Sequence, residues 1–411
     1  MDNYRDFYDN FDRYGATDTE NDTDEDSTEV DNGDDEKPFG FDVSGFRPII
    51  EKSYDSIRLI SERAAIGVSE NRVYYIETGT ERLTNFSASD VGKMTTFGDK
   101  YVVLSEGGSM RLFDYSGRAI SDAYEAVSLA GNTAFLKTAN LIDVVIDGQT
   151  VRRGVSGNYI LTSESTCRNT DVPDTVYSVP DFVELRIDGM KVIDEPYEGV
   201  ALVKRNGKIG YVDSVKGKIL ISPRYSFASQ FSNGYAAVRA NSSLDYPIII
   251  DKKGNEIFDF GSNKTFTSEY PARNVLVYPC HENYVFFSAG QNSARRYGYV
   301  DILADKPEIV FLPAAPFAFR NYGGYAVLSG YSKLFDLSSA RIVNDITARS
   351  IVPASDGFIL DRNGKCDFID FSLNLVAEGL DGLSCLDGLY SVCVGNEFYV
   401  CTFNDKILQK S

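Results

Sequence analysis

A phrase of about 35 residues recurs along this chain, and it restricts the possible folds more than any other feature. Its clearest copy runs from Gly207 to Ala240, with the sequence GKIGYVDSVKGKILISPRYSFASQFSNGYAAVRA. Two short apolar runs, Lys208–Asp213 and Lys218–Ile221, flank a turn in which Gly217 can adopt a positive φ, which is typical of a β-hairpin. An Asn-Gly pair then precedes a third apolar run, YAAVRA. We therefore expect each unit to contain three strands.

The copies can be aligned on the acidic or amide residue that closes the first strand. These markers are Glu77, Asp114, Asp147, Asp213, Asp251, Asp301, Asp336, Asp370 and Asn404. Successive markers lie 33 to 38 residues apart, except for one gap of 66 residues and one of 50. We interpret the longer gap as a degenerate unit around residues 180–193, preceded by a loop insertion at residues 163–180, and the shorter gap as an insertion at residues 279–295. A period of this length is typical of solenoids and propellers.

The strands carry apolar residues on both faces, as in YPIIID and RVYYIE, so one unit cannot bury its own surface and neighbouring units must stack. We predict an all-β fold of repetitive antiparallel hairpin units over residues 46–411. A propeller-like arrangement is favoured, and an open β-solenoid is the alternative. Nine or ten units exceed a typical ring with one blade per unit, so we expect the units to pair or to form two rings. The number of blades stays open.

The unit from Gly207 to Ala240 resembles the bacterial WG-repeat family. The residues that carry the resemblance are Gly207, Lys208, Gly210, Tyr211, Val212, Asp213, Gly217, Pro223, Tyr225, Phe231, Ser232, Gly234, Ala236 and Val238. Ile209 stands where the family usually has tryptophan, and the chain contains no Trp. Residues 297–301 repeat the motif with Tyr in that place. The resemblance implies a repetitive β fold and an interaction role, and it supplies no catalytic residues.

The charge of the chain is unevenly distributed. Residues 1–37 carry a net charge of −12 out of −19, which leaves −7 for residues 38–411. We expect residues 1–45 to be a disordered acidic tail, because residues 16–38 contain a single aliphatic side chain. The net charge of each part is negative, so we expect no basic surface on either part. Nucleic acids and anionic membranes are therefore not expected partners. We find no secretory signal or long apolar run and expect a cytoplasmic protein.

Within the acidic tail, aromatic residues recur at helical spacing. They are Tyr4, Phe7, Tyr8, Phe11 and Tyr14. At 3.6 residues per turn they would form one stripe on a short helix. Such a stripe is typical of a segment that binds in a groove, although an unstructured leader with incidental aromatics explains the pattern equally well.

Residues with catalytic chemistry are few. His281 is the only histidine, and its neighbour Cys280 would point to the opposite face of an extended strand. The six cysteines show no CxxC spacing, so we expect reduced core thiols, although Cys385, Cys393 and Cys401 follow one another at a spacing of eight. Neither a metal site nor a cofactor is expected.

These observations favour a non-catalytic scaffold that binds another protein or peptide. The alternative is a carbohydrate-active hydrolase or lyase on a β-propeller, which would need two carboxylates facing one cleft. A third hypothesis is self-association through open sheet edges.

Overall fold

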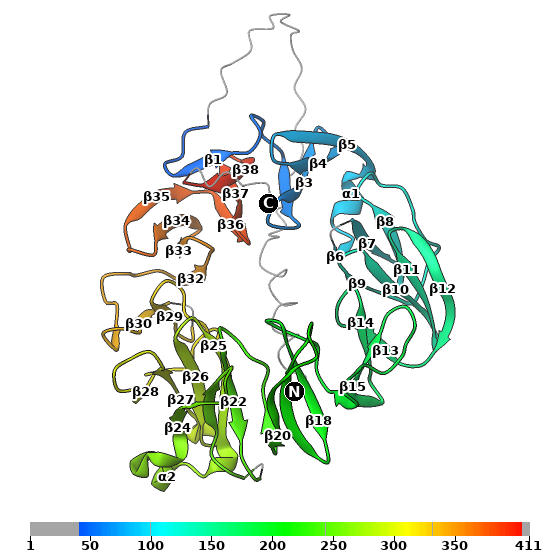
Figure 1. The fold of residues 1–411 in the computed structure, drawn as a ribbon. Helices are drawn as coiled ribbons and strands as arrows, with labels where there is room; N and C mark the ends of the chain where they lie inside the picture. The colour runs from blue at the N-terminus through cyan, green and yellow to red at the C-terminus, as the bar shows by residue number, and fades with distance from the viewer. Residues whose placement is uncertain (1–40, 99, 243, 331, 405–411) are drawn as a thin grey trace, which may run out of the picture. The chain divides into compact units, whose positions relative to one another are not determined.

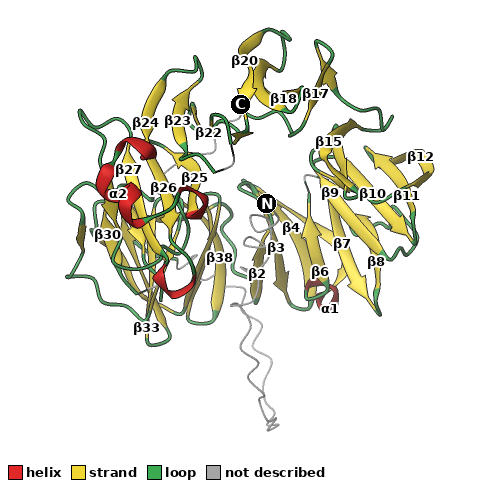
Figure 2. Ribbon diagram, turned by 90° about the horizontal axis from the view of Figure 1, so that it is seen from below, coloured by secondary structure: helices red, strands yellow, loops and turns green. Residues whose placement is uncertain are grey.

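The computed structural model describes residues 41–404, except residues 99, 243 and 331. In this part of the chain, antiparallel β-sheets follow one another in sequence order (Figure 1). Helices are few and short, as the small amount of red in Figure 2 shows. They are α1 (Ala88–Val91), α2 (Lys264–Glu269), η2 (Phe260–Ser262), η3 (Ala272–Asn274) and η4 (Asn292–Ala294). The predicted all-β class is confirmed.

We number the sheets as blades 1 to 10 in chain order. The strands of blades 1 to 5 are, in blade 1, β2 (Ser56–Leu59), β3 (Ala64–Ser69), β4 (Arg72–Glu77) and β5 (Thr80–Ser87); in blade 2, β6 (Met94–Phe97), β7 (Tyr101–Glu106) and β8 (Ser109–Asp114); in blade 3, β9 (Ala126–Ala130), β10 (Thr133–Thr138), β11 (Leu141–Ile146) and β12 (Gln149–Ser156); in blade 4, β13 (Tyr159–Leu161), β14 (Thr166–Asn169) and β15 (Val172–Ser178); and in blade 5, β16 (Arg186–Ile187), β17 (Met190–Val192), β18 (Val200–Arg205), β19 (Lys208–Asp213) and β20 (Ile219–Tyr225).

The second half of the chain continues in the same way. The strands of blades 6 to 10 are, in blade 6, β21 (Phe227–Ala228), β22 (Tyr235–Arg239), β23 (Ile248–Asp251) and β24 (Glu256–Asp259); in blade 7, β25 (Val275–His281), β26 (Tyr284–Ala289), β27 (Arg296–Asp301) and β28 (Ile309–Phe311); in blade 8, β29 (Tyr325–Val327), β30 (Leu334–Asp336) and β31 (Arg341–Ile342); in blade 9, β32 (Ser350–Pro353), β33 (Gly357–Arg362), β34 (Lys365–Asp370) and β35 (Leu375–Leu380); and in blade 10, β36 (Gly382–Leu386), β37 (Leu389–Val394) and β38 (Glu397–Phe403), with β1 (Phe46–Pro48) as the fourth strand.

The hydrophobic cores lie between blades rather than inside them. Ile66 of blade 1 packs in one cluster with Val102 of blade 2, and the described residues form a cluster of this kind at each junction of consecutive blades. One of these clusters joins Leu389 and Val400 of blade 10 to Ile76 of blade 1. Because the last blade packs on the first, the ten sheets form a closed β-propeller.

Strand β1 closes the ring through backbone hydrogen bonds as well. It pairs antiparallel with β38, with Phe46 opposite Phe403, so the start and the end of the ring share one sheet (Figure 1). Just after β1, the N–H of Ile49 donates to the carbonyl of Val400 at 2.8 Å. The sheet therefore joins residues that are about 350 positions apart in sequence.

The sequence unit and the structural blade are out of phase. In the unit from Gly207 to Ala240, the hairpin β19–β20 belongs to blade 5, whereas the third predicted strand, β22, belongs to blade 6. Each unit therefore links two blades covalently. The same offset explains why the first strand of the chain completes the last blade.

Two expectations about the units need correction. Residues 163–180, interpreted as a loop insertion, contain β14 and β15, and together with β13 they form blade 4. Residues 279–295, interpreted as a second insertion, belong largely to β25 and β26, and the extra residues lie earlier, at residues 260–274. The ten sheets form one ring, so the units neither pair nor form two rings.

Candidate interaction surface

The turn residues of the family signature shape backbone hairpins. Asn206 and Gly207 have φ values of 51° and 76° between β18 and β19, the left-handed pair that a two-residue hairpin turn requires. Gly217 lies in the turn between β19 and β20, and Gly234 lies just before β22. These glycines therefore determine where strands reverse.

Asp213 caps the turn that follows β19. Its carboxylate accepts hydrogen bonds from the N–H groups of Val215 at 3.0 Å and Lys216 at 2.8 Å. These bonds hold the pKa of Asp213 below its usual value. The equivalent Asp251, Asp336 and Asp370 accept backbone N–H bonds within their own turns in the same way.

Gly210 and Pro223 mark a close crossing of β19 and β20. A Cβ added at Gly210 would lie 2.5 Å from both the carbonyl oxygen of Ile221 and the nitrogen of Pro223. The pairing of the two strands shifts register at this point. The glycine is needed because the backbone of β20 occupies the space of a side chain.

The aromatic signature residues build the core between blades 5 and 6. Tyr211 and Phe231 are buried, and their rings lie 4.6 Å apart. The hydroxyl of Tyr211 donates to the carbonyl of Ser229 at 2.7 Å, and burial raises the pKa of this tyrosine. Tyr225 completes the same cluster. The motif residues described above thus shape turns, a strand crossing and a core; they are Gly207, Gly210, Tyr211, Asp213, Gly217, Pro223, Tyr225, Phe231 and Gly234.

The predicted aromatic stripe of Tyr4, Phe7, Tyr8, Phe11 and Tyr14 lies outside the described residues. Its role as a binding segment stays a prediction.

Cys280 and His281 do not form a nucleophilic pair. Cys280 is 5% exposed, and its thiol donates to the carbonyl of Glu282 at 3.3 Å. Burial raises the pKa of Cys280 to about 12, which keeps the thiol protonated at neutral pH. Burial lowers the pKa of His281, which follows Cys280 within β25 and therefore projects from the other face of the strand.

The cysteines near the end of the chain are also structural. Cys393 and Cys401 are buried in blade 10, and Cys385 is partly buried. Burial raises the pKa of both Cys393 and Cys401. Within residues 41–404, apart from residues 99, 243 and 331, no cluster of three or more His, Cys, Asp or Glu side chains could hold a metal ion.

A cavity of about 310 Å³ lies beside blades 9 and 10, and two carboxylates line it. Asp370 is committed to its turn, because its oxygens accept hydrogen bonds from Ser372 N–H and from both nitrogens of Asn374 at 2.9 to 3.0 Å. Asp356 accepts a hydrogen bond from the Tyr390 hydroxyl at 3.0 Å. Both carboxylates therefore already accept hydrogen bonds from protein groups.

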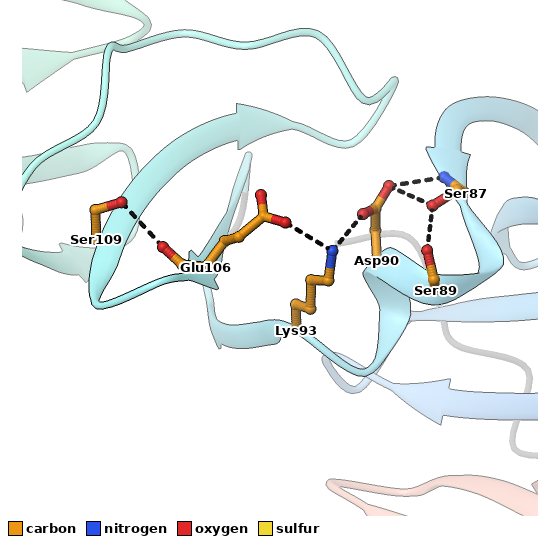
Figure 3. Close-up of polar contacts among 6 residues, drawn as sticks. All are labelled: Ser87, Ser89, Asp90, Lys93, Glu106 and Ser109. Carbon is orange, nitrogen blue, oxygen red and sulfur yellow. Dashed lines mark hydrogen bonds and ion pairs between the residues drawn. The ribbon is translucent and has the colours of Figure 1, made fainter.

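A polar network lies between blades 1 and 2 (Figure 3). Asp90 accepts hydrogen bonds from the N–H and the hydroxyl of Ser87, which caps α1. Lys93 donates to Glu106 at 3.0 Å and lies 3.7 Å from Asp90. Every side chain in this network has a partner within it, so we interpret it as a helix cap.

The largest group of exposed apolar side chains close in sequence lies on the hairpin β19–β20. Val215 is 87% exposed, and Ile219 and Leu220 are each 37% exposed. Exposed cations surround them on the same strand and on the neighbouring turn of blade 6. We call this set the β20 surface, and it consists of Val215, Lys216, Lys218, Ile219, Leu220, Arg224 and Lys253.

Sequence reasoning missed the β20 surface because it averaged charge over residues 38–411. Residues 200–253 contain nine Lys or Arg and three Asp or Glu, a local net charge of +6. A shorter charge window would have found this region. Over blades 5 and 6 as a whole, residues 186–259, the net charge is only +2, so the excess of cations is local to the β20 surface.

Comparison with family models identifies one repeat. Residues 209–242 match the model of the WG containing repeat, in agreement with the resemblance seen in the sequence. The matched segment runs from β19 to just beyond β22 and so crosses from blade 5 into blade 6. No curated protein sequence matches the chain.

Several solved structures are distantly similar. A eukaryotic initiation factor is 11% identical, over 85% of this chain and 90% of that one, with a TM-score of 0.36. Hsv2 of Kluyveromyces lactis is 7% identical, over 62% and 98% of the two chains, with a TM-score of 0.28. The dihydro-heme d1 dehydrogenase NirN is 13% identical, over 68% and 72%, with a TM-score of 0.32. Similarities this low do not bear on function.

Proposed function

We propose that this chain, which carries a WG containing repeat at residues 209–242, is a non-catalytic scaffold that binds another protein or peptide. The observation that carries the proposal is the β20 surface, where exposed apolar and basic side chains gather on the end strand of a blade. Exposed apolar groups bordered by polar residues are typical of protein-binding surfaces.

Other blades also expose apolar side chains on their fourth strands. Examples are Leu83 on β5, Val151 on β12 and Leu375 on β35, which are 62%, 48% and 52% exposed. Each of these strands pairs with only one neighbouring strand, so it forms an edge of its sheet. A ring of such strands offers several contact positions on one rigid body, which suits a scaffold.

Affinity capture followed by size-exclusion chromatography with light scattering tests the proposal. We expect the full chain to retain a protein that re-forms a complex of fixed stoichiometry when both purified components are mixed. If purified candidates never form a complex, and the protein instead converts a substrate, the scaffold proposal is wrong.

The alternative is a hydrolase or lyase acting on carbohydrate, and the cavity beside blades 9 and 10 is the position to test. A panel of glycosides and polysaccharides would be incubated with the protein and with Asp356→Asn, which removes one lining carboxylate. Turnover that disappears in Asp356→Asn would favour an enzyme. The hydrogen bond from Tyr390 to Asp356 leads us to expect no turnover with either protein.

A further inference from the structure

The β20 surface is a basic region in an acidic protein. Residues 200–253 carry a net charge of +6, whereas the chain as a whole carries −19. Acidic residues are sparse here, and Asp213 is the only one within β18, β19 and β20. Four of the nine cations are already used, because Lys204, Arg205 and Lys252 pair with acidic residues outside this window and Arg239 is buried. The positive charge available to attract an anionic group is therefore that of the β20 surface.

The cations of the β20 surface are not neutralised by ion pairs. None of the described ion pairs involves Lys216, Lys218, Arg224 or Lys253, although Lys252 pairs with Glu198 at 3.0 Å. Lys216 and Lys218 act on the Asp213 carboxylate and Lys253 acts on that of Asp251, and each of these carboxylates already accepts two backbone N–H bonds. Four exposed cations thus have charge available for a partner.

Blades 5 and 6 bring these cations together across a blade boundary. Arg224 donates to the carbonyl of Gly254 at 3.5 Å, and Gly254 follows Lys253 in the turn between β23 and β24. The same glycine lies beside the Ile221 side chain. Lys253 is therefore next to the strand that carries Lys218 and Arg224, and the cations form one surface.

Strand alternation arranges this surface into a row. Ile221 and Tyr225 point into the core between blades 5 and 6, so Lys218, Leu220 and Arg224 point outward, and all three are exposed. Side chains on one face of a strand repeat about every 7 Å. Ser222 is also exposed and lies between Leu220 and Arg224, so the row reads basic, apolar, polar, basic, with Lys218 just before the strand. An extended peptide with an acidic residue at each end and an apolar residue between them would match this row.

Building on the proposed function, we propose that the β20 surface binds an extended acidic peptide segment that carries apolar or aromatic side chains. The acidic residues would contact Lys216, Lys218, Arg224 and Lys253, and the apolar side chains would cover Val215, Ile219 and Leu220. Exposed charges of this kind mainly accelerate association and confer salt dependence, while the apolar contacts slow dissociation.

A peptide fits this surface better than a nucleic acid does. The cations are interleaved with aliphatic side chains that have no role in binding phosphates, and the seven residues of the β20 surface include no aromatic ring on which a base could stack.

The experiment measures binding of a fluorescent peptide by anisotropy at two salt concentrations. The probe has the sequence of residues 2–37 of this chain, which combines a net charge of −12 with aromatic residues. A control peptide carries Asn and Gln in place of every Asp and Glu. Two forms of the protein are used: the full chain, and a chain that begins at Gly40, which keeps every strand because β1 begins at Phe46.

Two triple variants distinguish the effect of charge at the β20 surface from the effect of the same charge change elsewhere on the chain. The test variant is Lys216→Glu, Lys218→Glu, Lys253→Glu, and the matched control is Arg82→Glu, Arg118→Glu, Lys306→Glu, at sites whose side chains are 72% to 84% exposed. We expect the test variant to weaken binding about tenfold or more and to abolish most of the salt dependence, with little change in the control. Circular dichroism confirms that both variants are folded.

The outcomes distinguish this inference from the proposed function. If the shortened chain binds the peptide more strongly than the full chain, residues 1–39 compete for the β20 surface. If both bind it equally, the surface is open to a peptide of another protein. Both outcomes support the inference. Equal loss in both triple variants, no preference over the neutral peptide, or tighter binding of a single-stranded DNA of equal charge would overturn it. A stable protein complex that the test variant still forms would retain the scaffold and reject this surface.

Discussion

At the residue scale, two different residue types occur where the end strand of a blade closely crosses the strand beside it. The third residue of the strand that pairs with the end strand of a blade faces the point where the end strand crosses it, and in β19 of the WG repeat this residue is Gly210, opposite Pro223. In blades 3 and 9 the same position holds Asp143 and Asp367, whose carboxylates accept the N–H of a glycine in the fourth strand at 2.8 Å. All three strand pairs shift register there. In blade 5 the crossing residue is Pro223, which has no N–H that needs an acceptor. In blades 3 and 9 it is a glycine, whose N–H donates to the carboxylate of Asp143 or Asp367.

This geometry predicts the effect of Gly210→Ala. The added methyl group would lie 2.5 Å from two backbone atoms of β20, so the strands must separate, and the free energy of unfolding should fall by about 1–3 kcal/mol. Urea unfolding followed by circular dichroism measures the change. Gly92→Ala is the control, because no atom lies within 4 Å of the added Cβ and φ is −67°. Equal midpoints for the two variants would show that β20 tolerates the methyl group.

At the element scale, one buried cation holds the helical insertion against blade 6. Arg239, at the end of β22, is 9% exposed and donates to the carbonyls of Ala272 at 3.2 Å and Val275 at 2.7 Å, and also to that of Asp245. Burial lowers the pKa of Arg239. Ala272 and Val275 lie at the C-terminal end of the helical insertion, so these bonds hold that end of the insertion against blade 6.

Arg239→Met should therefore destabilise the protein and loosen the insertion first. The substitution keeps an apolar side chain of similar length but leaves buried carbonyls without a donor, which should cost about 3 kcal/mol. Hydrogen exchange with mass spectrometry should show faster exchange in residues 260–274 than in blade 2. Arg82→Met, at an exposed position, is the control and should change stability by less than about 0.5 kcal/mol. Uniform exchange in both variants would contradict this role.

At the scale of the whole molecule, the ring depends on its closure at blade 10. Phe46 of β1 contacts the rings of Phe368, Tyr390 and Phe403 at centroid distances of 5.2 to 5.5 Å. Its side chain thereby links β34 of blade 9 to β37 and β38 of blade 10, the sheet in which the ring closes. A propeller whose last sheet lost this strand would expose an apolar edge.

Phe46→Ala should lower the free energy of unfolding by about 3–5 kcal/mol, because it removes a buried ring that three other rings surround. Thermal unfolding followed by calorimetry measures the loss. Leu83→Ala removes an apolar side chain that is 62% exposed on another end strand and should change little. If the two variants melted together, β1 would not contribute to closure.

The buried cysteine thiols and tyrosine hydroxyls of the cores predict that the protein loses stability at alkaline pH. Burial raises the pKa of Cys167, Cys280 and Tyr399 to about 12. A group whose pKa is raised by folding contributes stability that is complete below its unfolded pKa, near 9 for the thiols and 10 for tyrosine, and is lost as pH rises toward its folded pKa.

Urea midpoints should therefore be similar at pH 7 and 8 and should fall steadily between pH 9 and 12. Absorbance at 295 nm should show that part of the tyrosines ionise only together with unfolding, since burial also raises the pKa of Tyr54 and Tyr390. A constant midpoint up to pH 11, or tyrosines that all titrate near pH 10 in the folded protein, would contradict this expectation.

The sequence predicted what depends on local chemistry. Gly207, Asp213 and Gly217 identified the hairpin, because turns of this kind require those residue types within a few positions. Blade 4 was missed because its third strand ends at Ser178, without the acidic residue that marks the other units. The β20 surface was missed because its cations lie on two blades, and charge averaged over the chain hides them.

By itself, then, the sequence determined the repeat, its strands and its turns, since each follows from contacts between residues close in the chain. The tertiary structure decided the number of blades, the phase between unit and blade, and the closure by β1. These depend on how each apolar face packs on its neighbour, summed around the ring. The tertiary structure also decided which charged side chains stay unpaired at the surface, because Lys253 meets the β20 strand only when blades 5 and 6 pack together.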